Sequence, residues 1–236
     1  ADEEVAELRA LMHELRLRPP MRRGRRAVRH RSGGEIDLRA SLRGLHRTGG
    51  DAVNLVRTRR ADRPRRIVVL CDISGSMQPY ARAYLQFLHV ARGAGRADVF
   101  SFATRLTRLT RAMGTTDASR AVARAAEAAP DWHGGTRIAD AVRAFLDGYG
   151  RRGMARGAVV VIVSDGWEAG EPSALGAQME RLARLAHRIV WVNPRAADAR
   201  YEPLAGGMAA ALPHCDALVS GHSVAALRAV LLEVAR

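Results

Sequence analysis

The chain has 236 residues, of which 47% are hydrophobic and 26% are charged, a composition typical of globular domains. This length allows one sizeable core and a smaller second unit, and no apolar run reaches the roughly 20 residues of a membrane-spanning helix. The formal net charge is +14, and the two cysteines lack the spacing of a metal site or a disulfide framework, so we expect a cytoplasmic protein without a membrane association.

The positive charge is concentrated in one segment. Residues 16–66 contain 17 Arg and four acidic residues, and the whole chain contains no Lys. Arg binds carboxylates and phosphates through two parallel hydrogen bonds, but this segment has no aromatic side chain for base stacking. The segment therefore favours docking to a protein or packing within the fold; solvated charge and binding of nucleic acid remain as alternatives.

The sequence of the N-terminal part indicates only short elements of regular structure. Residues 3–15 have the apolar spacing of a short amphipathic helix, and two prolines follow it. Residues 18–35 lack periodicity and are expected to be extended or mobile, residues 38–45 have a helical pattern, and residues 53–58 alternate like an edge strand. We divide the chain into an N-terminal helix with an Arg-rich extension, 1–59, and an α/β domain, 60–236.

Strands and helices alternate from residue 66 onward. Short apolar runs predict strands at 67–71, 97–102, 158–164, 187–192 and 214–220, with a shorter, antiparallel strand at 105–110. Helical patterns are found near 79–92, 117–129, 137–146, 172–185, 205–211 and 223–235. This order predicts a doubly wound, mostly parallel sheet with helices on both faces.

Oxygen-bearing side chains follow two of the predicted strands and begin one helix. Asp72, Ser74 and Ser76 follow the first strand, Asp165 follows the strand at 158–164, and Thr136 follows a Gly pair at a helix start. The carboxyl edge of such a sheet is where ligands bind, and oxygen ligands suit Mg2+. Taken singly, Thr136 could be only a helix N-cap, and either Asp could only cap its own turn.

Taken together, the three loops resemble the metal-ion-dependent adhesion site of von Willebrand factor A domains. The first element of that site reads Asp-x-Ser-x-Ser, and a Thr and an Asp follow on two later loops. The resemblance implies that Asp72, Ser74, Ser76, Thr136 and Asp165 hold Mg2+ or Mn2+. It also implies that an Asp or Glu of a protein partner completes the metal shell, so that the site binds a partner and is not an enzyme's catalytic centre.

Four residues lie next to the predicted metal loops. Trp132 and His133 precede the Gly pair, and Trp167 and Glu168 follow Asp165. Aromatic side chains are frequent at the energetic centres of interfaces, so we assign these four to partner binding. Packing within the loops is the alternative for the first three, and Glu168 could instead tune the metal or be solvated.

A magnesium-dependent phosphotransferase or hydrolase is the competing enzymatic reading, because Asp72 and Asp165 both lie at predicted strand ends. The chain has no Lys, no phosphate loop that ends in Lys-Ser or Lys-Thr, and no Gly-x-Ser-x-Gly after a strand. These absences favour a non-enzymatic protein.

The C-terminal part resembles the bacterial CoxE-like branch of A-domain proteins. The similarity rests on Trp-Val-Asn-Pro at 191–194, on the segments 201–208, 212–216 and 220–223, and on Arg-Thr-Gly-Gly at 47–50; it covers roughly 37–236. It implies an accessory factor that works with a MoxR-type AAA+ ATPase in the maturation, or metal insertion, of a client metalloenzyme such as carbon monoxide dehydrogenase. The alternative function is binding of nucleic acid or acidic surfaces through 16–66.

Overall fold

The computed structural model describes residues 19–47, 49, 55–77, 80, 84–85, 87–89, 97–114, 120–121, 123–124, 127, 136–197 and 206–236. The chain divides into a small compact unit, Met21–Pro64, and a larger unit that contains Arg65–Arg236. The domain division at residue 60 stays a prediction. The predicted helix at 3–15 lies outside the described residues.

The larger unit is built on a six-stranded sheet in the order β6-β5-β4-β7-β8-β9. All neighbouring strands are parallel except β5 and β6, so the predicted antiparallel edge strand is confirmed. The strands are β4 (Ile67–Asp72), β5 (Ala97–Phe102), β6 (Leu106–Arg108), β7 (Val159–Val163), β8 (Arg188–Asn193) and β9 (Ala217–Ser220). The chain proceeds outward in both directions from β4, which makes its carboxyl end a topological switch point.

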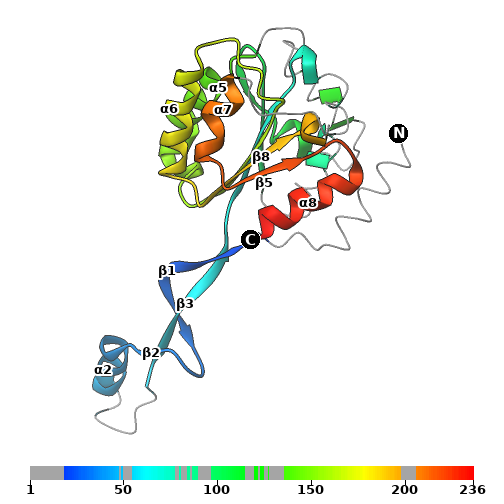
Figure 1. The fold of residues 1–236 in the computed structure, drawn as a ribbon. Helices are drawn as coiled ribbons and strands as arrows, with labels where there is room; N and C mark the ends of the chain where they lie inside the picture. The colour runs from blue at the N-terminus through cyan, green and yellow to red at the C-terminus, as the bar shows by residue number, and fades with distance from the viewer. Residues whose placement is uncertain are drawn as a thin grey trace. The chain divides into compact units, whose positions relative to one another are not determined.

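Helices cover both faces of this sheet, as predicted (Figure 1). On one face, Val68 and Leu70 of β4 belong to a buried cluster with α5 (Ile138–Phe145), α6 (Pro172–Ala183) and α7 (Gly206–Ala211). On the other face, Val69 packs in a cluster with α8 (Val224–Ala235) and with the helical residues around Tyr84. Because both faces are covered, every residue of β4 is buried, which explains its uninterrupted apolar sequence.

Several boundaries differ from the sequence prediction. The last strand begins at Ala217 and not at residue 214, because His214 belongs to the 3₁₀ turn η5 (Leu212–His214). The helix after Thr136 begins at Ile138 and continues as the π-helix η3 (Leu146–Met154). Shorter 3₁₀ turns are η1 (Gly75–Met77), η2 (Ala112–Gly114) and η4 (Pro194–Ala197). Most of the predicted helix at 117–129 lies outside the described residues.

The small unit is a three-stranded antiparallel sheet with one helix. Its strands are β1 (Met21–His30), β2 (Glu35–Ile36) and β3 (Arg57–Pro64), in the order β1-β3-β2. The helix predicted at 38–45 is confirmed as α2 (Leu38–Arg47). Residues 18–35 were expected to be extended or mobile, and β1 confirms the extended alternative over Met21–His30. The strand pairs with β3 through its backbone, which requires no apolar alternation, so the Arg-rich sequence showed no strand periodicity.

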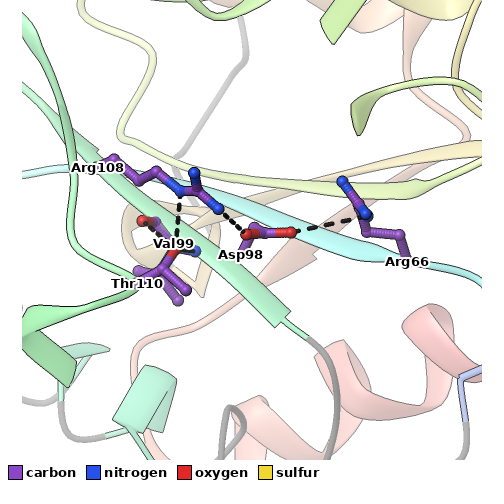
Figure 2. Close-up of polar contacts among 5 residues, drawn as sticks. All are labelled: Arg66, Asp98, Val99, Arg108 and Thr110. Carbon is purple, nitrogen blue, oxygen red and sulfur yellow. Dashed lines mark hydrogen bonds and ion pairs between the residues drawn. The ribbon is translucent and has the colours of Figure 1, made fainter. Parts of the chain in front are cut away.

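The β5–β6 edge is fixed by a small polar network (Figure 2). Asp98 lies between Arg108, whose Nη2 is 2.7 Å from its Oδ1, and Arg66, whose Nε is 3.7 Å from its Oδ2. The Thr110 hydroxyl accepts a hydrogen bond from the backbone N–H of Val99 at 3.0 Å. Thr110 thus supplies a partner for a β5 amide at the end of the short strand β6.

We expect Thr110→Val to lower the free energy of unfolding by about 1–2 kcal/mol, because it leaves the Val99 amide without its acceptor. The matched control is Thr107→Val on β6, whose hydroxyl makes no such bond among the described residues. Urea denaturation of both variants measures the difference. Equal free energies for the two variants would contradict the role given to Thr110.

Candidate metal centre

Asp72 is the last residue of β4, at the topological switch point, and its side chain is fully buried. Its Oδ1 accepts a hydrogen bond from the Ser74 backbone N–H at 2.9 Å. Its Oδ2 accepts one from the Ser164 hydroxyl, at the end of the neighbouring strand β7, at 2.7 Å. The carboxylate is therefore held by two donors from two adjacent strand ends.

Ser74 and Ser76 lie on the turn that follows β4. Their hydroxyl oxygens are 3.2 Å apart, and Ser74 is buried whereas Ser76 is exposed. The backbone N–H of Met77 donates to the Ser74 carbonyl at 3.0 Å, and the Met77 side chain is buried in the core. Met77 therefore anchors the turn η1 and fixes the place of both hydroxyls.

Asp165 follows Ser164 at the end of β7. Its Oδ1 accepts from the Trp167 N–H at 3.2 Å, whereas its Oδ2 is buried without a hydrogen-bond partner among the described residues. The Asn193 side-chain amide at the end of β8 donates to the Asp165 carbonyl at 3.1 Å. The Asp165 loop is thus fixed in place, while one of its buried carboxylate oxygens still lacks a partner.

Thr136 is buried just before α5. Thr136 is not the N-cap that its position suggested. Arg137 occupies the N-cap position, and its side chain makes no capping hydrogen bond. The Thr136 carbonyl accepts from the Ala169 N–H at 2.9 Å, and the Arg137 N–H donates to the Ala103 carbonyl after β5 at 3.3 Å. These bonds tie the Thr136 segment to the Asp165 loop and to the carboxyl end of β5.

The residues assigned to partner binding separate into three cases. Trp132 and His133 lie outside the described residues. Trp167 is 65% exposed beside Asp165, and its role in partner binding stays a prediction. Glu168 is half-buried, and both of its carboxylate oxygens accept backbone hydrogen bonds at 2.8 Å, Oε2 from Ala139 in the first turn of α5 and Oε1 from Gly170.

Two residues with supporting roles were missed by the sequence analysis, Ser164 and Asn193. Both are fully buried polar residues, and each joins the end of one strand to a loop that leaves another. Each is a polar residue that ends an apolar run, and Asn193 also lies in the Trp-Val-Asn-Pro segment of the family resemblance. A position at the end of such a run does not separate them from ordinary turn residues.

The electrostatics of the centre favour a cation. Burial, with a smaller contribution from the charge of Asp165, raises the pKa of Asp72 to about 6, although hydrogen bonds from Ser74 and Ser164 lower it. Although the chain carries a net charge of +14, no Arg among the described residues pairs with Asp72 or Asp165. A buried carboxylate without a counter-charge is costly.

The donor set fits a hard divalent cation. Within the described part of the chain, no three His, Cys, Asp or Glu residues gather as a metal cluster. The five predicted ligands instead offer two carboxylates and three hydroxyls at one edge of the sheet, including the unpartnered Asp165 Oδ2. Oxygen ligands of this kind suit Mg2+ and Mn2+ better than zinc-type nitrogen and sulfur ligands do.

A family model described as "VWA domain containing CoxE-like protein" matches residues 5–227. The chain belongs to this CoxE-like family of von Willebrand factor A domain proteins. No curated protein matches the sequence. The family match covers both compact units, so the small Arg-rich unit lies within the matched region.

Solved structures agree with this fold. Proximal thread matrix protein 1 from the mussel byssus is similar at 15% identity and a TM-score of 0.51, over 72% of this chain and 46% of that one. A von Willebrand factor type A protein from Catenulispora acidiphila is similar at 15% identity and 0.51, over 75% and 42%. BatB from Bacteroides thetaiotaomicron is similar at 16% and 0.47, over 72% and 97%. This chain thus spans less than half of the first two proteins. The mussel protein has also been solved with a zinc-occupied adhesion motif.

No helix in the described part of the chain has the length and apolarity required to cross a membrane.

We expect Asp72→Asn to stabilise the metal-free protein at pH 8. The pKa of Asp72 is about 6 in the folded state against an ordinary 3.8, so above pH 6 folding buries a charge, at a cost of up to about 3 kcal/mol. The gain from Asn is greatest above pH 6 and disappears as the pH falls below 3.8, where both states bind the proton. Unfolding in urea with EDTA measures it.

The same substitution removes a metal ligand, so Mg2+ should raise the melting temperature of the wild type and leave that of Asp72→Asn unchanged. The control is Asp140→Asn, an exposed carboxylate in the first turn of α5, which should respond to Mg2+ as the wild type does. A magnesium-induced shift that survives in Asp72→Asn would exclude Asp72 as a ligand.

Proposed function

We propose that this protein is a divalent-cation-dependent adhesion module in which Asp72, Ser74, Ser76, Thr136 and Asp165 hold Mg2+ or Mn2+. The observation that carries the proposal is a pair of buried carboxylates at the switch point that no described Arg neutralises, one of them with an unpartnered oxygen. Membership of the von Willebrand factor A family supports the same conclusion.

The residues of the site determine what it would bind. Asp72 is positioned by Ser164 and by the Ser74 amide, so it needs little reorganisation to accept a cation. The other three ligands are neutral hydroxyls. The two carboxylates therefore supply two negative charges, which balance the charge of a divalent cation without exceeding it. When bound, the cation supplies a Lewis-acidic position that favours a further anionic oxygen, and an Asp or Glu of a protein partner fits that requirement.

We further propose that the partner is a MoxR-type AAA+ ATPase and that the pair acts in the cytoplasm on a client metalloenzyme of the carbon monoxide dehydrogenase kind, in its maturation or metal insertion. The ATPase supplies the energy, and this protein holds the partner or client through the metal. Membership of the CoxE-like family supports this role, and both cysteines are free thiols, as suits a reducing compartment. The protein itself then needs no catalytic residue.

The test is capture of the purified MoxR-type ATPase from the same organism by the immobilised full chain. We expect retention in Mg2+, and at least a tenfold loss in EDTA or with Asp165→Asn, because the cation loses one of two carboxylates. The control is Asp147→Asn, which removes an exposed carboxylate of η3 paired with Arg181. Equal retention with and without Mg2+ would contradict the adhesion mechanism. No retention in Mg2+ would contradict the choice of partner.

A further inference from the structure

We propose that the small unit, Met21–Pro64, is a second docking surface that binds an acidic protein segment carrying apolar side chains. This surface uses none of the metal ligands, so it goes beyond the adhesion function proposed above. Three observations carry it: the orientation of α2, the concentration of exposed apolar side chains, and unpaired positive charge.

The helix α2 turns two small side chains inward and exposes two of its three leucines, while the third, Leu45, is half-buried. Ala40 and Ser41 are buried, and the Ser41 hydroxyl accepts a hydrogen bond from the Val56 N–H at 2.9 Å. Leu38 and Leu42, one turn apart on another side of the helix, are 68% and 55% exposed. A helix that buries Ala and Ser while it exposes Leu is oriented for a partner that covers the leucines.

The apolar side chains of this unit are exposed more often than elsewhere in the molecule. The described residues include eight large hydrophobic side chains that are exposed, and six of them belong to this 44-residue unit, against Trp167 and Leu232 in the larger one. The six are Met21, Val28, Ile36, Leu38, Leu42 and Leu55. Isolated exposed leucines are normal on protein surfaces, but such a concentration in one small unit indicates an interaction surface.

The same unit carries an excess of positive charge. It contains 13 Arg and four acidic residues, and none of its described Arg forms an ion pair with another described residue. The strand register places Arg22 opposite Arg63, and like charges in directly opposed positions destabilise a sheet. An acidic partner would relieve this repulsion, so charge complementarity defines the sign of the occupant.

Exposed leucine and arginine side chains together favour a protein segment as the ligand of this surface, in preference to nucleic acid or a second copy of the chain. On α2, Arg39 and Arg43 each follow an exposed leucine in sequence and are exposed themselves. Nucleic acid would engage the Arg side chains but would leave the leucines uncovered, and the unit has no Phe, Tyr or Trp on which bases could stack. A second copy of the chain would bring two strongly positive units together. An acidic segment with apolar anchors satisfies both kinds of side chain.

The probe for this surface is a fluorescein-labelled synthetic helical peptide with Glu on one face and Leu on the other. Its anisotropy is titrated with the full chain in EDTA at physiological salt. The comparison ligands are the same peptide with every Leu replaced by Ser and a single-stranded oligonucleotide of equal charge. We expect the Leu-containing peptide to bind at least tenfold more tightly than the Ser-containing one.

Substitutions in the small unit test whether the peptide binds to this surface. Leu38→Ser with Leu42→Ser should weaken the Leu-containing peptide about tenfold, the effect of losing roughly 1.4 kcal/mol of apolar burial. Leu232→Ser, an exposed leucine of α8, should have no effect. Arg22→Gln with Arg63→Gln should weaken both peptides. Asp72→Asn should leave all affinities unchanged, which separates this surface from the metal centre.

Three results would overturn the proposal. Equal affinity for the two peptides would show that charge alone is recognised, and tighter binding of the oligonucleotide would show a nucleic-acid surface. A large drop in melting temperature for the Leu38→Ser, Leu42→Ser variant, but not for Leu232→Ser, would show that the leucines are covered by the chain itself.

Discussion

The hydrogen bond from the Ser164 hydroxyl to Asp72 joins the ends of two adjacent parallel strands at the place where the sheet changes winding direction. A fully buried carboxylate is tolerated there because Ser164 and the Ser74 amide each solvate one of its oxygens. The same bond requires β4 and β7 to end in register, as their pairing from Ile67 with Val159 to Cys71 with Val163 provides. This bond therefore fixes one of the two buried carboxylates that give the edge its negative charge.

The loop after β7 contacts the starts of two helices, α7 and α5. Gly166 adopts a positive φ of 81°, which glycine tolerates without strain. At the start of α7, a Cβ on Gly207 would lie 2.7 Å from the Gly166 carbonyl oxygen and 2.6 Å from the Glu168 Cβ. Only a glycine lets this helix approach so closely. The loop that carries Asp165 therefore packs closely against the start of α7 and is hydrogen-bonded to the first turn of α5.

The parallel sheet could be predicted because its buried strands are uninterrupted apolar runs in the sequence. Asp72 and Asp165 could be predicted as metal ligands because each stands at the end of one of these runs. The long-range contacts could not be predicted in the same way. Glu168 spans 29 positions to reach Ala139, and Ser164 spans 92 to reach Asp72, and no local pattern encodes either distance. The pairing of β1 could not be predicted for a different reason: the segment was expected only to be extended or mobile, because the pairing depends on backbone groups and nine of its ten residues are exposed and show no core-facing alternation.

The position of Glu168 has a consequence for which anions the edge can accept. The first turn of a helix presents free amides and a partial positive charge, and this combination makes helix starts natural phosphate sites. In α5 the Ala139 amide is already engaged by the Glu168 carboxylate. A nucleotide or free phosphate that approached this helix would meet a negative charge instead of an open cradle. The Glu168 carboxylate therefore makes the start of α5 unfavourable for phosphate.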